Sequence, residues 1–233
     1  MKINEFIKSL KELNINISEE QLSQLNIYKE FMQEYNKHTN LTRIIDDEEV
    51  YLKHFYDSLT ICKYVDLNNY NNLLDLGTGA GFPGMVLKIM FPNLKVTLLD
   101  SNNKKITFLK ELSQKLNLDV ELIQDRAEVF AKTRRESFDI VTSRAMANLR
   151  VLLELSIPFN KVDGLFIAMK ANADDEIKEA NNTHELLGSK LVSINKFDLK
   201  DNKRTIIIYK KEKETNNIYP REYNIILKKP IKK

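Results

Sequence analysis

The sequence is poor in several residue types, since its 233 residues contain one cysteine, six glycines, five prolines and no tryptophan. With Cys62 alone, the chain cannot form an internal disulfide or a cysteine zinc cluster. No apolar run approaches the ~20 residues that a membrane helix needs. Residues 1–6 alternate polar and apolar side chains, unlike a signal peptide. We therefore expect a cytoplasmic protein with no metal and no membrane contact.

The chain also lacks a strong excess of either charge, because its net charge is +3. The distribution is uneven, however. Residues 203–233 carry ten Lys or Arg and three Glu, which makes this end +7 and residues 1–202 −4. A basic end on a mildly acidic body could bind a phosphate backbone. A solvated tail is the alternative, since charge runs are usually solvent-exposed faces.

Four of the six glycines lie close together, in the stretch 73–84. Residues 73–76 have the apolar character of a buried parallel strand. Gly77, Gly79 and Gly81 then allow a sharp turn, because glycine reaches positive φ cheaply and has no Cβ to keep a ligand from the backbone. An apolar helix follows. Strand, glycine loop and helix form the ligand-binding start of a doubly wound α/β sheet.

The glycine spacing fits two classes of cofactor. From Gly79 it matches the Gly-x-Gly-x-x-Gly pattern of dinucleotide-binding proteins. From Asp75 it is Asp-x-Gly-x-Gly-x-Gly, the form typical of S-adenosylmethionine (SAM) methyltransferases. Asp100 ends the next apolar run, where a carboxylate accepts hydrogen bonds from a ribose. Both cofactors contain that ribose, and Asp100 could instead simply cap the following helix, so the loop leaves the cofactor open.

The last two predicted strands distinguish these classes. Residues 191–197 and 205–209 are joined by the short polar turn 198–203, which predicts an antiparallel hairpin because a parallel return needs a crossover. A mainly parallel sheet that ends in a hairpin is typical of SAM methyltransferases, whereas a dehydrogenase more often continues with βα units. We therefore predict an α/β fold of the Rossmann-like class I SAM-dependent methyltransferases, with a mostly parallel seven-stranded sheet.

The apolar periodicity suggests how the chain is divided. Residues 1–66 have helical stripes and are expected to form an N-terminal helical cap. The SAM-binding core would follow at residues 67–212, and a basic C-terminal segment at 213–233 would pack on it, so that the whole is effectively one domain.

Three residues of the expected cap, His54, Asp57 and Ser58, lie close together in the sequence. A hydrolase triad is conceivable. However, Ser and His four residues apart on one helix, without a strained nucleophile turn, favour a structural role or the lining of a groove.

Polar side chains follow the ends of the predicted parallel strands. Asp100 ends the second strand, 125–128 (Asp-Arg-Ala-Glu) follows the third, and Arg144 follows the fourth. The carboxyl ends of parallel strands meet at one edge, where open α/β sheets bind ligands. We therefore expect Arg144 to be a site residue, the alternative being a surface ion pair.

Several motifs occur in the order seen in one known family: 75–84 (Asp-Leu-Gly-Thr-Gly-Ala-Gly-Phe-Pro-Gly), Asp100-Ser101, Arg126-Ala127-Glu128, Ser143-Arg144-Ala145, Tyr219-Pro220-Arg221 and Lys228-Lys229-Pro230. From about residue 34 to residue 230 the sequence resembles the ribosomal small-subunit RNA methyltransferase G family, also called glucose-inhibited division protein B. Its members are bacterial enzymes that transfer a methyl group from SAM to N7 of one guanine in 16S rRNA. The resemblance implies SAM as the cofactor and 16S rRNA or the small ribosomal subunit as the partner.

The resemblance also implies roles for individual residues. It implies that Gly77, Phe82 and Arg144 contact SAM, that Ala127 and Glu128 lie beside the adenine, and that Asp100 holds the ribose. We also expect cofactor contacts from Asp75, Gly79, Gly81 and Ser101, and a catalytic role for Arg144. The resemblance implies RNA binding by the basic tail, at Arg221, Lys228 and Lys229. The chain departs from the family at Ala171, where glycine is usual, and at Glu222 and Asn224, where a basic residue and glycine are usual. These departures leave the conformation of the 219–230 loop open.

An N7 target fits the lack of an acid–base or nucleophile constellation. Guanine N7 is a neutral ring nitrogen with a lone pair and no proton to lose, so attack on the sulfonium methyl needs in-line placement and no general base. Methylation of exocyclic amines usually uses Asn/Asp-Pro-Pro-Tyr/Phe where this chain has Ser143-Arg144-Ala145-Met146, and methylation of pyrimidine C5 needs a thiolate, whereas Cys62 precedes the sheet. We hypothesise that Arg144 contacts the guanine edge or its phosphate, since arginine matches the O6/N7 face of guanine.

Three other functions stay open at this point. A SAM enzyme for another substrate would methylate metabolites or proteins and leave rRNA unmodified. A non-catalytic assembly factor with a methyltransferase fold would bind RNA without turnover, and a nicotinamide enzyme would bind NAD in place of SAM. Because the chain has no coiled-coil heptads, we expect a monomer.

Overall fold

The structure, a computed structural model, describes residues 1–231. The chain forms two compact units. The first comprises residues 1–71 and 78–124, and the second comprises residues 72–77 and 125 onward. The expected division into cap, core and basic segment stays a prediction.

The N-terminal part of the first unit is helical, as the sequence predicts. Helix α2 begins with a reciprocal cap, because Ser18 Oγ accepts from the Gln21 backbone N–H (3.1 Å) and the Gln21 side chain accepts from the Ser18 backbone N–H (2.9 Å). The unit contains α1 (Ile3–Glu12), α2 (Glu19–Asn36), α3 (Asp47–Glu49), a π-helical segment (Val50–Tyr56), α4 (Asp57–Leu59), 3₁₀ turns (Thr60–Lys63 and Leu67–Asn69), α5 (Gly84–Met90), β2 (Lys95–Asp100), α6 (Asn103–Leu116) and β3 (Glu121–Gln124).

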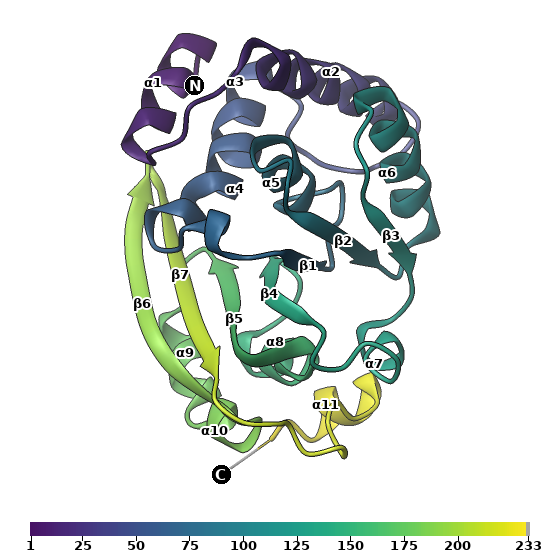
Figure 1. The fold of residues 1–233 in the computed structure, drawn as a ribbon, viewed down its shortest axis with the longest axis vertical. Coiled ribbons are helices and arrows are strands. Elements are labelled where there is room, and N and C mark those ends of the chain that lie inside the picture. The colour runs from purple at the N-terminus through teal and green to yellow at the C-terminus, as the bar shows by residue number, and fades with distance from the viewer. Residues whose placement is uncertain (232–233) are drawn as a thin grey trace. The chain divides into compact units, whose positions relative to one another are not determined.

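Strands β2 and β3 of the first unit pair in parallel, with Asp100 opposite Gln124 at their carboxyl ends. Aromatic side chains from the helices fill the core beside them. Tyr28 of α2 and Phe108 of α6 are fully buried, and Phe31 and Phe108 are stacked with ring centroids 5.4 Å apart. Helix α2 is thus fixed against α6, which starts directly after β2 (Figure 1).

The second unit contains most of the sheet. Strand β1 pairs with β4 and β4 with β5, in parallel, while β7 pairs antiparallel with both β5 and β6. The unit contains β1 (Asn72–Leu76), α7 (Ala127–Phe130), β4 (Phe138–Arg144), α8 (Leu149–Ser156), a 3₁₀ turn (Ile157–Phe159), β5 (Asn160–Lys170), α9 (Asp174–Ala180), α10 (Thr183–Leu186), β6 (Ser189–Leu199), β7 (Asn202–Lys211) and α11 (Tyr223–Lys228).

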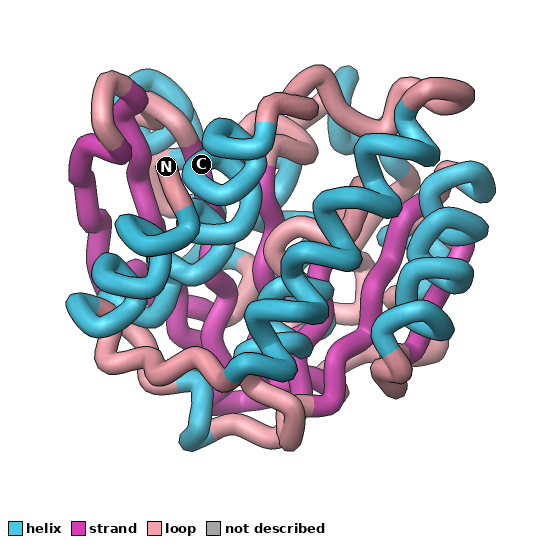
Figure 2. The backbone as a smooth tube through the Cα atoms, turned by 90° about the horizontal axis from the view of Figure 1, so that it is seen from above, coloured by secondary structure: helices cyan, strands magenta, loops and turns pink. Residues whose placement is uncertain are grey.

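The predicted class of fold is confirmed. The strand order along the sheet is β3-β2-β1-β4-β5-β7-β6, mostly parallel with an antiparallel hairpin at the end. Figures 1 and 2 show β6 and β7 as two long neighbouring strands. The predicted turn at 198–203 is shorter than expected, because Leu199 pairs with Asn202 and leaves two residues, one of which, Lys200, has φ of +52°. Polar composition marked a turn here, but the ladder continues through the polar residues on both sides.

Helices α8, α9 and α10 pack against one another in the second unit. Helix α8 is the most apolar of them, and Leu149, Leu152, Leu153 and Leu155 are fully buried. Among the described residues, no helix combines the length and apolar character required to cross a membrane.

Candidate functional site

The glycine loop of the first unit makes a turn that only glycine accommodates. Gly79 and Gly81 have φ of +63° and +100°, a region that glycine enters at little cost. A Cβ on Gly81 would lie 2.5 Å from Tyr28 Oη and 2.9 Å from Leu109 Cδ2. Position 81 therefore requires glycine both for its backbone conformation and for close packing against α2 and α6.

Asp100 joins this loop to the end of β2. Its Oδ2 accepts a hydrogen bond from the Gly79 backbone N–H (3.0 Å) and lies 3.4 Å from Lys105 Nζ, while its Oδ1 accepts from the Asn102 N–H (2.9 Å). Helix α6 is capped by Asn102 and not by Asp100. A carboxylate offers about four acceptor positions, so Asp100 can hold the loop and still accept from a ribose hydroxyl. Ser101 is exposed beside it.

Phe82, at the end of the glycine loop, is packed inside the first unit and is only 5% exposed. Its ring is nearly parallel to the ring of His54, with centroids 4.2 Å apart and 10° between planes. It is also nearly parallel to Tyr28, at 5.2 Å and 9°, and the Tyr28 hydroxyl donates to the Ala80 carbonyl. Phe82 can therefore bind the cofactor only through its backbone, because its ring packs against the rings of His54 and Tyr28.

The trio His54, Asp57 and Ser58 is buried. The Ser58 hydroxyl donates to the backbone carbonyl of His54 (2.6 Å), and the His54 ring lies 3.0 Å from Thr42 Oγ1. The geometry thus favours the structural interpretation of the trio.

The only cysteine of the sequence, Cys62, is not a suitable nucleophile either. Burial raises the pKa of the Cys62 thiol to about 12, so this thiol is protonated and a poor nucleophile at neutral pH.

In the second unit, Asp75 is fully buried in β1 opposite Thr142 of β4. The end of β1 is held against the end of β4, because the Ser143 hydroxyl donates to the Leu76 carbonyl (2.7 Å). Gly77 has φ of +71°, and a Cβ there would lie 2.9 Å from Met146 Cγ. Glycine at position 77 therefore leaves room for the side chain of Met146, which lies in the loop after β4.

The segment predicted to lie beside the adenine, Ala127–Glu128, begins α7. Ala127 is buried, and Glu128 Oε1 accepts from Arg126 Nε (2.6 Å). The Arg126 guanidinium lies over the ring of Tyr223, 4.8 Å from its centroid. A hollow of about 300 Å³ separates α7 from the chain at 220–224. The C-terminal segment thus contacts the element that carries the predicted adenine-binding residues.

Arg144 is the last residue of β4 and is half-buried, opposite Met169 of β5. The loop after it is fixed by Lys170, whose ammonium donates to the Ala147 carbonyl and lies 2.7 Å from Glu176 Oε2. The same Glu176 oxygen accepts from the backbone N–H at the start of α8 (2.7 Å). The sequence pointed only to the neighbouring Ala171, as a departure from the family pattern, and missed the anchoring role of Lys170.

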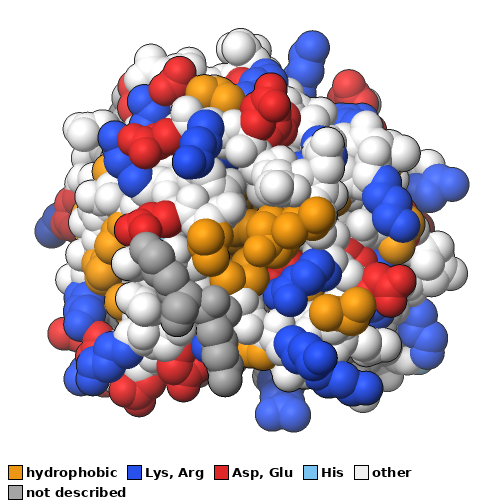
Figure 3. Space-filling model, turned by 90° about the horizontal axis from the view of Figure 1, so that it is seen from below, with side chains coloured by type: hydrophobic (Ala, Val, Ile, Leu, Met, Phe, Trp, Pro, Cys, Tyr) orange, Lys and Arg blue, Asp and Glu red, His pale blue; other side chains and the backbone are white. Residues whose placement is uncertain are grey.

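The three predicted RNA-binding residues differ in their surroundings. Lys228 and Lys229 are exposed. Arg221 instead holds the fully buried Glu154 with two charged hydrogen bonds, Nε to Oε1 (2.8 Å) and Nη2 to Oε2 (2.6 Å), and donates from Nη1 to the Lys229 carbonyl (3.0 Å). The bond to Glu154 raises the pKa of Arg221. On the face in Figure 3, Lys and Arg side chains lie among apolar and acidic ones.

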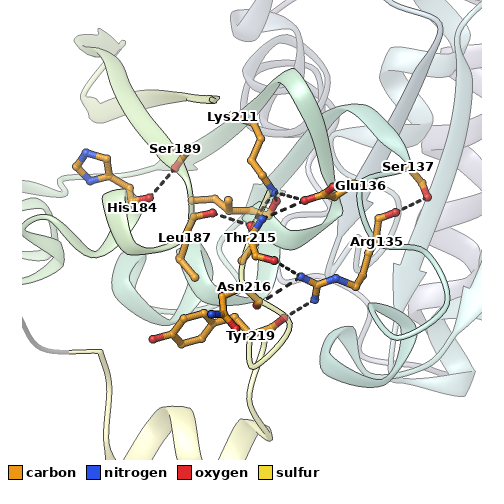
Figure 4. A network of polar contacts seen from close by, with 11 residues as sticks. Arg135, Glu136, Ser137, His184, Leu187, Ser189, Lys211, Thr215, Asn216 and Tyr219 are labelled. Carbon is orange, nitrogen blue, oxygen red and sulfur yellow. Dashed lines mark hydrogen bonds and ion pairs between the residues drawn. The ribbon is translucent and has the colours of Figure 1, made fainter. Parts of the chain in front are cut away.

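A buried polar network holds the chain that leads to this tail (Figure 4). The fully buried Lys211 donates to Thr215 Oγ1 (2.6 Å) and lies 3.3 Å from Glu136 Oε1, and burial lowers its pKa to about 8. Arg135 donates to the carbonyls of Thr215 (2.7 Å) and Tyr219. The path of the chain from β7 to residue 219 is therefore set by charged groups within the second unit.

Solved structures share this fold. A methyltransferase from Pyrococcus furiosus is 19% identical and has a TM-score of 0.52, covering 65% of this chain and 82% of that chain. The M. jannaschii TYW2 structure, in complex with AdoMet, is 16% identical with a TM-score of 0.50, covering 60% of this chain and 68% of that one. At these identities the likeness concerns the fold, which is that of the class I methyltransferases.

Sequence relatives are much closer. The Ribosomal RNA small subunit methyltransferase G of Oceanobacillus iheyensis is 47% identical and covers 99% of this chain and 100% of that protein. The protein of the same name from Bacillus subtilis is 45% identical and covers 99% of each chain. The family model described as rRNA small subunit methyltransferase G matches residues 21–207. The chain therefore belongs to the rRNA small subunit methyltransferase G family.

Proposed function

We propose that this protein transfers a methyl group from SAM to N7 of one guanine in 16S rRNA, within the bacterial cytoplasm. The observation that carries the proposal is the match to relatives named for this activity over 99% of the chain. The glycine loop held by Asp100 supports the cofactor part of the proposal, and the basic residues near the C-terminus support the RNA part.

The residues present fit SAM. Asp100 supplies a carboxylate acceptor for ribose hydroxyls, and Gly77, Gly79 and Gly81 all adopt positive φ in a turn whose glycines add no Cβ between the backbone and a ligand. We assign the remaining cofactor contacts to Asp75, Phe82, Ser101, Ala127, Glu128 and Arg144. When bound, SAM supplies a methyl group on a positively charged sulfur, open to attack by a nitrogen lone pair.

The protein needs little acid–base chemistry for this reaction, because guanine N7 has no proton to lose. Its contribution is to hold the base in line, and such alignment can contribute on the order of 7–11 kcal/mol in good cases. We assign Arg144 to the guanine O6 edge or a neighbouring phosphate, since its fork donates two parallel hydrogen bonds.

The RNA part of the proposal rests on the basic C-terminal segment. Lys228 and Lys229 are exposed and can pair with phosphates. Arg221 is ion-paired with Glu154, so we assign it the role of fixing the conformation of the tail. Any contact of Arg221 with RNA would use the part of the guanidinium that Glu154 leaves open. Residues 1–66 would act as a helical cap on the 67–212 core, and the enzyme would act as a monomer.

The proposal is tested by incubating the protein with labelled SAM and small ribosomal subunits from cells that lack the modification. We expect label in 7-methylguanosine after nucleoside digestion, and none with subunits already modified. RNA binding without label would instead support an assembly factor. Label in proteins or metabolites alone would support another substrate.

A further inference from the structure

The loop at residues 37–46, between α2 and α3, has a defined conformation built on side-chain hydrogen bonds. Asn36 Oδ1 accepts from the backbone N–H groups of Leu41 (2.8 Å) and Thr42 (3.1 Å), and Asn36 Nδ2 donates to the Thr42 carbonyl (3.0 Å). At the far end, Gln33 Nε2 donates to the Ile45 carbonyl (2.6 Å). The loop is therefore preorganised on α2.

One side of this loop reaches the interior through Thr42. Its hydroxyl oxygen accepts from the Ile44 N–H (3.1 Å) and lies 3.0 Å from His54 Nε2. A hydroxyl has one proton and two lone pairs, so it can serve both partners at once. The loop is thus hydrogen-bonded to a buried histidine whose ring is stacked on Phe82.

The stack leads directly to the glycine loop. Phe82 is the residue after Gly81, and its neighbour in the stack, Tyr28, donates to the Ala80 carbonyl. The Phe82 backbone N–H bonds to the Thr78 carbonyl (3.0 Å), and Gly79 is bonded to Asp100. A displacement of Thr42 would therefore reach the proposed SAM-binding turn through one histidine ring, since close-packed interiors transmit strain.

The other side of the loop is exposed and favours an anionic partner. Lys37, His38, Asn40 and Arg43 are all exposed, and the one acidic residue of the loop, the exposed Asp46, accepts from the Glu49 backbone N–H at the start of α3. The ion pair of Lys37 with Glu34 joins two well-exposed side chains, and such pairs are weak in water. Positive and amide side chains on a preorganised loop match RNA phosphates and the edges of unpaired bases.

We propose that the 37–46 loop is a docking site for the RNA substrate and that His54 is a positioning residue, coupling this loop to the glycine loop through Thr42 and Phe82. The inference rests on the proposed function, because the partner is the RNA that is methylated. RNA on the loop would fix Thr42, and the stacked rings would hold the glycine loop in the form that binds SAM.

The test measures the affinity for S-adenosylhomocysteine, which shares the adenosyl group of SAM but has no methyl group to transfer, by calorimetry with and without saturating unmodified small subunits. We expect the Kd of the wild type for this analogue to fall at least fivefold with subunits, as in typical coupling between sites. Thr42→Val replaces the hydroxyl with a methyl group and so loses the contacts with both His54 and Ile44, whereas His54→Phe keeps a stacked ring and loses only the ring nitrogens. Each should reduce the coupling to below twofold, and the double variant should lose no more than either alone. Thr42→Ser retains the hydroxyl and should keep the wild-type coupling.

The RNA contact is tested separately. Arg43→Gln should weaken RNA binding, reduce the salt dependence of that binding by about one counterion, and leave the SAM Kd without RNA unchanged. Lys8→Gln, at an exposed lysine of α1, is the matched control and should change neither.

Equal coupling in wild type, Thr42→Val and His54→Phe would overturn the inference, as would wild-type enzyme that methylates subunits without any coupling. Both results leave the proposed function intact. Absence of methyl transfer when the wild type and the same subunits are given SAM would instead refute the proposed function, and the inference with it.

Discussion

Arg221 forms a bidentate ion pair with Glu154, a residue of α8 that is 1% exposed. The Arg221 backbone N–H donates to the same carboxylate (3.0 Å). One buried acid therefore fixes both the side chain and the main chain at the start of the tail, immediately before α11.

Arg221→Ala should destabilise the protein by about 2–4 kcal/mol, because it leaves the Glu154 carboxylate buried without its charged partner. Urea unfolding measures the loss. Arg221→Lys should recover only part of it, since lysine keeps the charge but cannot form the bidentate pair. The double variant Arg221→Leu/Glu154→Leu should be closer to wild type than Arg221→Ala. If Arg221→Ala unfolds like wild type and loses only RNA affinity, the side chain serves RNA and not the tail.

Asp100→Asn should weaken SAM binding by about 10- to 100-fold. The amide removes a negative charge and one acceptor, so it cannot both hold the Gly79 N–H and accept from a ribose hydroxyl, and hydrogen bonds to charged groups contribute about 1.5–3 kcal/mol. Calorimetry with SAM measures the change. Asp119→Asn, at an exposed aspartate of the same unit, is the control and should bind SAM normally. Unchanged affinity in Asp100→Asn would refute the assignment of the ribose site.

Lys211 should make the stability of the protein rise with pH above about 8. Burial lowers its pKa from 10.5 to about 8 in the folded state, so between these values the unfolded chain binds more protons than the folded one. Stability then increases with pH, by at most about 1.4 kcal/mol per unit. Below pH 8 the lysine is charged in both states and this contribution is constant.

The measurement compares wild type with Lys211→Met from pH 7 to pH 10 by urea unfolding, and the difference in unfolding free energy should grow by about 2.5 kcal/mol in favour of the wild type. The range ends at pH 10 because burial raises the pKa of Tyr209, and that of Tyr51 to about 12. Unfolding is favoured once these tyrosines ionise in the unfolded chain. A difference that stays flat across this range would show that Lys211 is not desolvated as its burial implies.

Local chemistry made the glycine turn predictable from the sequence. Gly77, Gly79 and Gly81 all adopt positive φ, and the strand–loop–helix order around them follows from apolar periodicity and short connections. The antiparallel hairpin was predictable for a similar reason, because a short connection excludes a crossover. Its exact turn was not, since cross-strand pairing of β6 and β7 overrides the polar composition of 198–203.

Contacts distant in sequence explain what was missed. Tyr28 lies in an apolar stripe that predicts burial and His54 belongs to the trio with Asp57 and Ser58, but neither pattern shows that both rings stack on Phe82. Arg221 counted as one more positive charge in a basic tail, while its partner Glu154 lies 67 residues earlier in the mostly apolar helix α8. Charge counts treat such residues as solvent-exposed, and only tertiary packing distinguishes a buried ion pair from an RNA contact.

Arg144→Lys should lower methyl transfer to small subunits by at least tenfold, while the SAM Kd changes by less than the rate does. Lysine keeps the positive charge but lacks the planar fork that makes two parallel hydrogen bonds to a guanine edge or a phosphate, and each such bidentate contact contributes about 1–3 kcal/mol. Single-turnover transfer with saturating SAM and subunits separates this effect from binding. Arg150→Lys, at a half-buried arginine of α8, is the matched control and should methylate at the wild-type rate. Full activity in Arg144→Lys would mean that charge alone suffices at this position, and the alignment of the guanine would then have to come from other residues of the site.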